Sequence, residues 1–182
     1  MHIHTYEKLW LGLSLLLITG FVATITYGAL GAGVEMVDDS GETVDPDALG
    51  EHPDFADPGV EQVGPNEYDV YVVAHRFYFE PGSSTQGFAP ITVPANSTVN
   101  FYITSADVVH GFGVAGTNAN TMVIPGEVSE LTVEVGEPAE YGIVCNEYCG
   151  SGHHTMEGLM QVVPPEEYNG TGSQTERLGG DS

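Results

Sequence analysis

The fold is set by one stretch of the chain, which reads Tyr141-Gly-Ile-Val-Cys145-Asn-Glu-Tyr-Cys149-Gly-Ser-Gly-His153-His-Thr-Met156-Glu-Gly-Leu-Met-Gln-Val-Val163. Its two ends are short runs rich in Val, Ile, Leu and Tyr, which is typical of strands, and the loop between them holds two thiols, an imidazole and a thioether. Soft ligands of this kind select copper over hard cations. A blue-copper site uses one Cys, two His and a weak axial Met, so this loop has one thiolate more than a single blue copper needs. The spacing C-x3-C-x3-H-x2-M therefore predicts a binuclear copper centre that both thiolates bridge.

A second imidazole has to come from elsewhere in the chain, and His110 is the candidate. It follows a strand-like run in which Val99, Phe101 and Ile103 alternate with polar neighbours. A His at the end of that run can close the site opposite the loop. The backbone carbonyl of Glu147, between the two Cys, supplies a further donor. The predicted ligands are His110, Cys145, Glu147, Cys149, His153 and Met156.

Two other interpretations of these residues remain open. His154 competes with His153 as the loop imidazole. The chain has only two cysteines, and a disulfide between them is the other alternative. A disulfide explains neither His153 and Met156 at fixed offsets nor the separate His110 segment.

The rest of the C-terminal two thirds is a succession of short apolar runs separated by Gly, Pro and Asn. Many short strands without a helical segment favour an all-β Greek-key sandwich or barrel, expected over residues 66–164. The copper loop is expected to join two neighbouring strands at one end of it. The predicted strands cover residues 68–73, 98–103, 131–135, 141–144 and 159–163.

The N-terminal part carries an uncharged run from Leu9 to Leu30, about 22 residues, which matches the length of a transmembrane helix. Residues 1–8 precede it, and Lys8 is the one basic residue that flanks it, so the N-terminus is expected on the cytoplasmic side and the copper domain on the outer face. A cleaved signal peptide is the alternative, because Ala29-Leu-Gly31 offers small residues. We expect a retained, single-pass anchor in the cell membrane.

The distribution of charge distinguishes the linker and the tail from the folded domain, and the net charge excludes nucleic acid as a partner. The 26 acidic residues against 3 basic ones give a formal net charge of −23, which excludes nucleic acid. This excess is typical of adaptation to very high salt, as in an extreme halophile, because salt screens repulsion between carboxylates. Residues 31–65 are acidic and rich in Gly and Pro, so we expect an extended linker, and residues 165–182 a disordered polar tail.

The segments Asp107-Val-Val-His110-Gly-Phe and Cys145-Asn-Glu-Tyr-Cys149-Gly-Ser-Gly-His153-His-Thr-Met156 resemble subunit II of haem–copper cytochrome c oxidases. The resemblance runs from about Thr5 to Val163. It implies the cupredoxin fold and the dinuclear copper centre called Cu-A. It also implies that an external donor, a cytochrome c or a small blue-copper protein, reduces this centre one electron at a time. The electrons then pass to haem in subunit I, another chain, where this proton-translocating oxidoreductase reduces oxygen to water.

Three finer expectations come from the same resemblance. Thr5-Tyr-Glu-Lys-Leu-Trp10 is similar to the single-span branch of the family, where Glu7 looks like the mouth of a proton-uptake path; the helix dipole alone also favours an acid there. Glu147 matches the commoner oxidases, where this carboxylate also reaches a magnesium ion. Phe77, Tyr78 and Phe79 lie in the segment where the family receives its donor, and core packing is the alternative for each of them.

A free, membrane-anchored copper electron carrier is the main alternative function, since it would need the same domain without an oxidase partner. A quinol oxidase subunit would lack the copper ligands, which argues against it here. Co-purification with haem-bearing subunits distinguishes the carrier from the oxidase.

Overall fold

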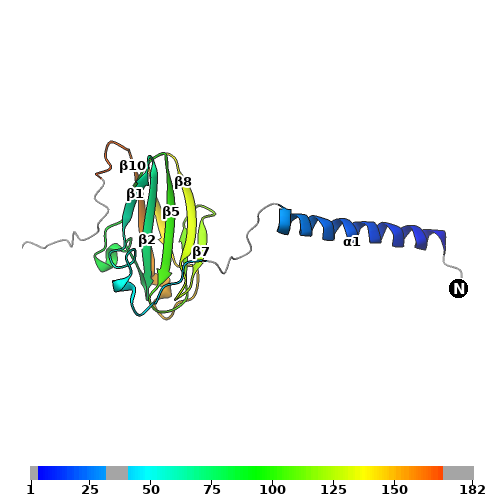
Figure 1. Ribbon diagram of the computed structural model, residues 1–182, viewed down its shortest axis with the longest axis horizontal. Coiled ribbons are helices and arrows are strands. Elements are labelled where there is room, and N and C mark those ends of the chain that lie inside the picture. Colours follow the sequence, from blue (N-terminus) through cyan, green and yellow to red (C-terminus); the bar gives the residue numbers. More distant parts are fainter. Residues whose placement is uncertain (1–3, 32–40, 170–182) are drawn as a thin grey trace, which may run out of the picture. The chain divides into compact units, whose positions relative to one another are not determined.

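The computed structural model describes residues 4–31 and 41–169, and these form two separate units. Figure 1 shows the first as a single helix and the second as a β unit. Part of the expected linker, residues 32–40, and most of the expected tail, residues 170–182, lie outside the described residues.

The first unit is the helix α1, Thr5–Gly31, of 27 residues. It begins four residues before the uncharged run, because Thr5, Tyr6, Glu7 and Lys8 are already helical. At 1.5 Å per residue it is about 40 Å long, enough to cross a hydrocarbon core of about 30 Å. Its Thr5–Tyr27 part is apolar enough to span a membrane by length and composition, and none of it is buried within the chain.

The second unit consists of two sheets. One has the strand order β1-β2-β5-β8, with β3 also paired to β2, and the other has the order β4-β10-β9-β6-β7. The β2–β5 and β4–β10 pairs are parallel and the others antiparallel, so the chain crosses between the sheets in the Greek-key manner of a cupredoxin. The strands are β1 Val60–Gly64, β2 Glu67–His75, β3 Tyr78–Glu80, β4 Ile91–Pro94, β5 Ser97–Ser105, β6 His110–Val114, β7 Asn120–Val123, β8 Ser129–Val135, β9 Ala139–Val144 and β10 Glu157–Val163. Three short 3-10 helices cover Leu49–Glu51, Ser84–Gln86 and His153–Thr155.

The core lies between the sheets and follows from the alternation of side chains along the strands. Val70 and Val72 of β2 and Phe101 of β5 are fully buried from one sheet. Phe112 of β6 and Ile143 of β9 are fully buried from the other. The ring centroids of Phe112 and Phe101 lie 5.3 Å apart, so an aromatic contact joins the two sheets. Phe112 lies two residues after His110, the predicted ligand.

The β unit begins well before the expected boundary at residue 66. Val44, Leu49 and Phe55 are buried and pack with Val73 and Val128 in a second apolar cluster. Residues 41–59 therefore fold onto the outer side of the first sheet instead of forming the extended linker that their acidic composition predicted. Three apolar anchors hold the segment, while its carboxylates face solvent.

Candidate metal centre

The loop of residues 145–156 joins two adjacent antiparallel strands, as the sequence predicted. Glu157 at the start of β10 pairs with Val144 at the end of β9. The Cys145 N–H donates to the Met156 carbonyl at 3.3 Å, which closes the base of the loop. Within it, the His153 N–H donates to the Gly150 carbonyl, and the 3-10 turn from His153 to Thr155 follows. These bonds bring the Cys145 end of the loop close to its Met156 end and fix the turn at His153.

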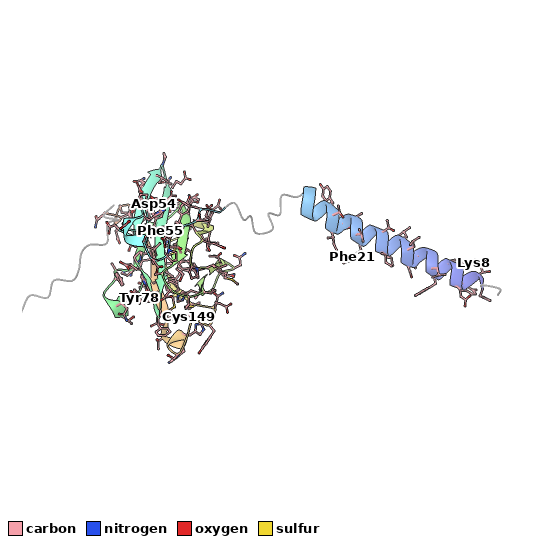
Figure 2. The ribbon with its side chains drawn as sticks, turned by 60° about the horizontal axis from the view of Figure 1, so that its bottom comes forward. Lys8, Phe21, Asp54, Phe55, Tyr78 and Cys149 are labelled. Atoms are coloured by element: carbon pink, nitrogen blue, oxygen red, sulfur yellow. The ribbon has the colours of Figure 1, made fainter. Side chains whose placement is uncertain are left out.

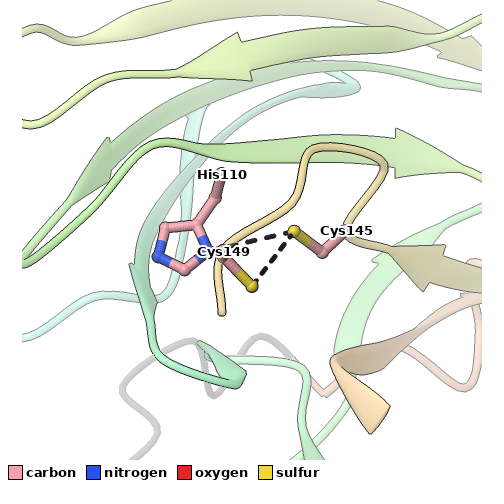
Figure 3. Close-up of side chains that lie close together, drawn as sticks. All are labelled: His110, Cys145 and Cys149. Carbon is pink, nitrogen blue, oxygen red and sulfur yellow. Dashed lines mark hydrogen bonds between the residues drawn. The ribbon is translucent and has the colours of Figure 1, made fainter. Parts of the chain in front are cut away.

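Sulfur and nitrogen donors converge inside the loop, as Figure 3 shows for His110, Cys145 and Cys149. Cys145 Sγ lies 3.8 Å from Cys149 Sγ and 3.8 Å from His110 Nδ1. Cys149 Sγ lies 3.6 Å from both His153 Nδ1 and Met156 Sδ. Cys145 Sγ also lies 3.1 Å from the carbonyl oxygen of Glu147. Every predicted ligand therefore contributes an atom to one cluster around the two thiols.

These separations fit ligands that share metal ions. Two donors about 2.0–2.3 Å from one first-row ion at a tetrahedral angle lie about 3.3–3.8 Å apart. A disulfide requires about 2 Å between sulfurs, and both thiols are free. The set is soft and largely buried, with Cys145, Cys149, Met156 and His110 all inside the fold, which suits copper.

His110 is oriented by a carboxylate that the sequence analysis did not single out. It is the first residue of β6 in the second sheet, not the end of the β5 run as expected, since β5 stops at Ser105. Its Nε2 lies 2.8 Å from Asp107 Oδ1, so Nδ1 is left to face Cys145. Asp107 also accepts the backbone N–H of Arg76 at 2.7 Å and of Val108 at 2.6 Å.

The same bonds determine the charge state of Asp107. Burial disfavours its ionised form, but the hydrogen bond from His110 and those from the Arg76 and Val108 N–H groups outweigh burial and hold the pKa of Asp107 below its usual value. An ionised carboxylate behind a ligating imidazole is the common arrangement at metal sites, where it fixes the ring and its tautomer.

Three glycines allow the loop to pack against its neighbours. A Cβ on Gly111 would collide with the Asn146 side chain, so this position lets the loop lie directly on β6. A Cβ on Gly152 would lie 2.5 Å from the Phe77 ring, and one on Gly150 3.2 Å from it. Phe77 therefore covers the loop from the β2–β3 turn, a contact that the spacing of the motif does not reveal.

Protons compete with metal for the thiols of this donor set. Burial, the neighbouring Cys145 charge and the hydrogen bond with Cys145 raise the pKa of Cys149 to about 11. The thiol is thus protonated at neutral pH until a metal displaces the proton, since only the thiolate is a ligand.

The other sequence-predicted residues are distributed as follows. His154 is exposed and its ring is part of no described contact with the thiols, whereas its neighbour His153 faces Cys149. Phe79 is fully buried against Phe112, which favours core packing, the alternative given above for this residue. Phe77 and Tyr78 are half-buried.

Glu7 belongs to the helical unit and acts as a cap. The His4 N–H donates to its Oε2 at 2.8 Å, so Glu7 reaches back from the third helical position to the residue that precedes α1, as in a capping box. The sequence did not reveal this, because the usual Ser or Thr is replaced by His.

A second cluster of possible ligands contains Glu42, His52 and Asp54. Its carboxylates make their closest approaches to opposite ring nitrogens: Glu42 lies 3.6 Å from Nε2 and Asp54 3.9 Å from Nδ1. Nδ1 also accepts the Asp54 N–H at 3.2 Å. One ligand atom from each residue lies within 4.8 Å of the others, but Glu42 is exposed and His52 and Asp54 are only partly buried, so this geometry is that of a surface contact between Glu42 and the His52–Asp54 turn.

Comparisons with known proteins agree with this geometry. Residues 51–163 match the family model for the periplasmic domain of cytochrome c oxidase subunit II. A cytochrome c oxidase subunit 2 of Thermus thermophilus is 44% identical over 161 residues, which cover 86% of this chain and 91% of that protein. Heme-copper oxidase subunit 2 of Aeropyrum pernix is 35% identical over 106 residues, covering 54% of this chain and 45% of that one.

Among solved structures, a chain from the cryo-EM structure of a heme-copper terminal oxidase dimer superimposes with a TM-score of 0.57 and 31% identity. The match covers 86% of this chain and 99% of the other. The family match extends over most of the β unit and includes every residue of the metal loop. The chain therefore belongs to the cytochrome c oxidase subunit II family.

Proposed function

We propose that this chain is the electron-input subunit of a haem–copper terminal oxidase. The observation that carries the proposal is the convergence of two thiols, two imidazoles, a thioether and a carbonyl, with successive separations of 3.1–3.8 Å along the series Glu147–Cys145–Cys149–Met156. A pair of copper ions held by these residues would supply the one-electron redox chemistry that an electron-input subunit needs.

Each ligand has a defined task in holding such a pair. Cys145 and Cys149 present both thiols to the same space, so that each can bridge. His110 and His153 each face a different thiol, the first Cys145 and the second Cys149. Met156 and the Glu147 carbonyl complete the set as weak donors. Because β6, β9 and β10 fix these groups, the donor positions need to change little when the electron arrives.

The test is to load the full chain in detergent with copper and to record its electron paramagnetic resonance spectrum. We expect two coppers per chain and hyperfine structure from one electron shared by both nuclei. Cys149→Ser should bind at most one copper, whereas Ser151→Ala, a control in the same loop, should keep two. A mononuclear blue-copper spectrum from the parent chain would overturn the proposal.

The partners follow from the same function. We propose that a haem-bearing subunit I receives the electrons, and that the donor is a cytochrome c or a small blue-copper protein. We further propose that α1 anchors the chain with its N-terminus in the cytoplasm, supported by Lys8 on one flank and the acidic segment on the other. The half-buried Phe77, which lies against Gly150 and Gly152, supports electron input on that side of the loop.

A free copper carrier is the competing function, and isolation of the membrane complex decides between them. We expect haem-bearing chains to remain with this chain through mild detergent purification. The match to a chain of a heme-copper terminal oxidase, of which 99% is covered, supports the oxidase.

For Glu7 we propose proton uptake in addition to capping. Glu7→Gln keeps an acceptor for the His4 N–H but removes the titratable group, so it should slow turnover of the assembled oxidase while the copper centre is still reduced at its normal rate. Normal turnover of this variant would leave Glu7 as a cap only.

For Glu147 we propose that its exposed carboxylate helps to bind Mg²⁺ at the contact with subunit I. Its carbonyl faces Cys145 while its side chain points to solvent, so one residue can serve both ions. Loss of bound magnesium, but not of copper, from an assembled Glu147→Gln oxidase is the expected result.

A further inference from the structure

The β unit carries one basic side chain among many acids, and this residue is next to Phe77, which covers the loop of residues 145–156. Between Gly41 and Asn169 the sequence contains a single Lys or Arg, Arg76, among 20 Asp and Glu residues. Arg76 is exposed, and its guanidinium forms no ion pair with any residue in the described ranges. A lone cation in such a surface would be expected to pair with one of the many carboxylates, yet it is free to meet a partner.

The backbone places Arg76 close to the ligands. Its N–H donates to Asp107, and Asp107 in turn holds His110, so two hydrogen bonds separate the Arg76 main chain from a predicted ligand. The next residue, Phe77, covers the loop at Gly150 and Gly152. The turn that carries the cation is therefore fixed relative to the metal centre.

Exposed apolar side chains lie equally close to the ligands. Val109 precedes His110 and is 37% exposed, and Tyr148 precedes Cys149 and is 73% exposed. The Tyr148 ring also meets the His153 ring at 5.8 Å between centroids. Near the ligands the surface thus offers apolar contacts and a cation beside the exposed acids Asp107, Glu147 and Glu157, whereas the rest of the sequence from Gly41 to Asn169 has no Lys or Arg.

From this contrast we infer, resting on the proposed function, that the electron donor is an acidic protein and that one of its carboxylates pairs with Arg76. A basic donor is attracted to the whole acidic surface and repelled only at Arg76. Arg76 would therefore weaken the docking of a basic donor next to the metal centre. An acidic donor finds the one basic side chain of the β unit at Arg76. At molar salt the repulsion is screened beyond about 3 Å, so contact pairs and apolar contacts decide the docked position.

The test measures reduction of the copper-loaded full chain at molar KCl by two protein probes of opposite charge. The probes are reduced plant-type ferredoxin, which is acidic, and reduced mitochondrial cytochrome c, which is basic. Arg76→Gln should slow reduction by ferredoxin about two- to fivefold, the range expected for one exposed ion pair, and should not slow reduction by cytochrome c. Arg76→Lys should restore most of the rate.

The matched control is Gln62→Glu, which changes the net charge by the same amount. Gln62 pairs with Tyr68 of β2. Tyr68 lies seven residues before His75, so this pair is about 23 Å along the strand from the end of β2 that precedes Arg76. It should leave both rates unchanged.

Equal slowing by both donors in Arg76→Gln, or an effect no larger than that of Gln62→Glu, would overturn the inference alone, provided the copper spectrum is normal. A parent chain that binds no copper would overturn the proposed function and this inference with it.

Discussion

His110 and His52 of the β unit both lie close to carboxylates, but the two clusters behave differently. At the metal end, His110 is fully buried and lies 2.8 Å from Asp107, with Cys145 on its other nitrogen. In the N-terminal segment, His52 is partly exposed and lies 3.6 Å from Glu42 and 3.9 Å from Asp54. Figure 2 shows Asp54 and Cys149 well apart on the β unit.

The difference shows that residue type does not make a site. At His110 the carboxylate is fixed by two further backbone N–H groups, and burial makes each bond directional and costly to lose. At His52 the carboxylates are exposed and loosely placed, so water competes for them. The first cluster can hold an ion in one geometry, while the second links Glu42 to the His52–Asp54 turn within the N-terminal segment.

The largest effect should come from removing copper. A ligand at a thousand times its Kd stabilises the native state by about 4 kcal/mol, which corresponds to about 10–25 °C in Tm for a domain of this size. We expect calorimetry of the full chain to show a shift of that order between copper-loaded and copper-free protein. Cys149→Ser should lose most of it and Asp54→Asn none. A copper-dependent shift that disappears in Asp54→Asn would reverse the assignment of the two clusters.

Salt should act on the acidic surface and leave the metal end unchanged. With 26 acids and 3 bases, repulsion destabilises the fold at low ionic strength, because the screening length grows from about 3 Å at 1 M to about 30 Å at 0.01 M. Thermal unfolding over a KCl series should show Tm rising steeply toward molar salt, with a constant copper spectrum. A flat series would remove adaptation to high salt as the reason for the acidic excess.

Matched amide substitutions test the comparison directly. Asp107→Asn weakens the bond that orients buried His110 and should cost about 1–3 kcal/mol in denaturant unfolding of the copper-free chain. Glu42→Gln, at the exposed cluster, should cost at most about 1 kcal/mol. The copper spectrum should change in the first variant only. Equal costs in the two variants would mean that burial does not separate the clusters.

The smallest effect should appear at alkaline pH beside the N-terminal segment. Burial, followed by the charges of Asp54, Asp69 and Glu61, raises the pKa of Tyr71 from 10.0 to about 12. Since the folded pKa lies above the unfolded one, this contribution to stability is complete below pH 10 and is lost as the pH rises toward 12. Tyr71→Phe should therefore lose less stability over that range than the parent, while Tyr148→Phe, a substitution at an exposed ring, should follow the parent. Parallel curves for the parent and Tyr71→Phe would contradict the assignment.

The strands that the sequence predicted are those with clear alternation. Residues 98–103 and 131–135 lie within β5 and β8, where less exposed and more exposed side chains alternate. β6 was missed because all five of its residues are buried, so no alternation marks it. The 41–59 segment was missed because only Val44, Leu49 and Phe55 anchor it, at irregular spacing among acids.

Residue type and local spacing were enough to identify the donors and the loop that carries them. Ligand chemistry depends on residue type, and a short loop between two strands already brings two thiols, an imidazole and a thioether together. The acidic composition likewise sets the net charge without reference to any fold.

Which atoms face one another depends instead on contacts between distant segments. That His110 presents Nδ1 to Cys145 depends on Asp107, and Asp107 is held by a backbone N–H from a residue 31 positions away. Phe77 covers the loop of residues 145–156, and Arg76 precedes Phe77 in the chain. Both lie in the β2–β3 turn, which reaches the loop between β9 and β10. The strength of such contacts comes from burial and direction, neither of which a local pattern of residues records.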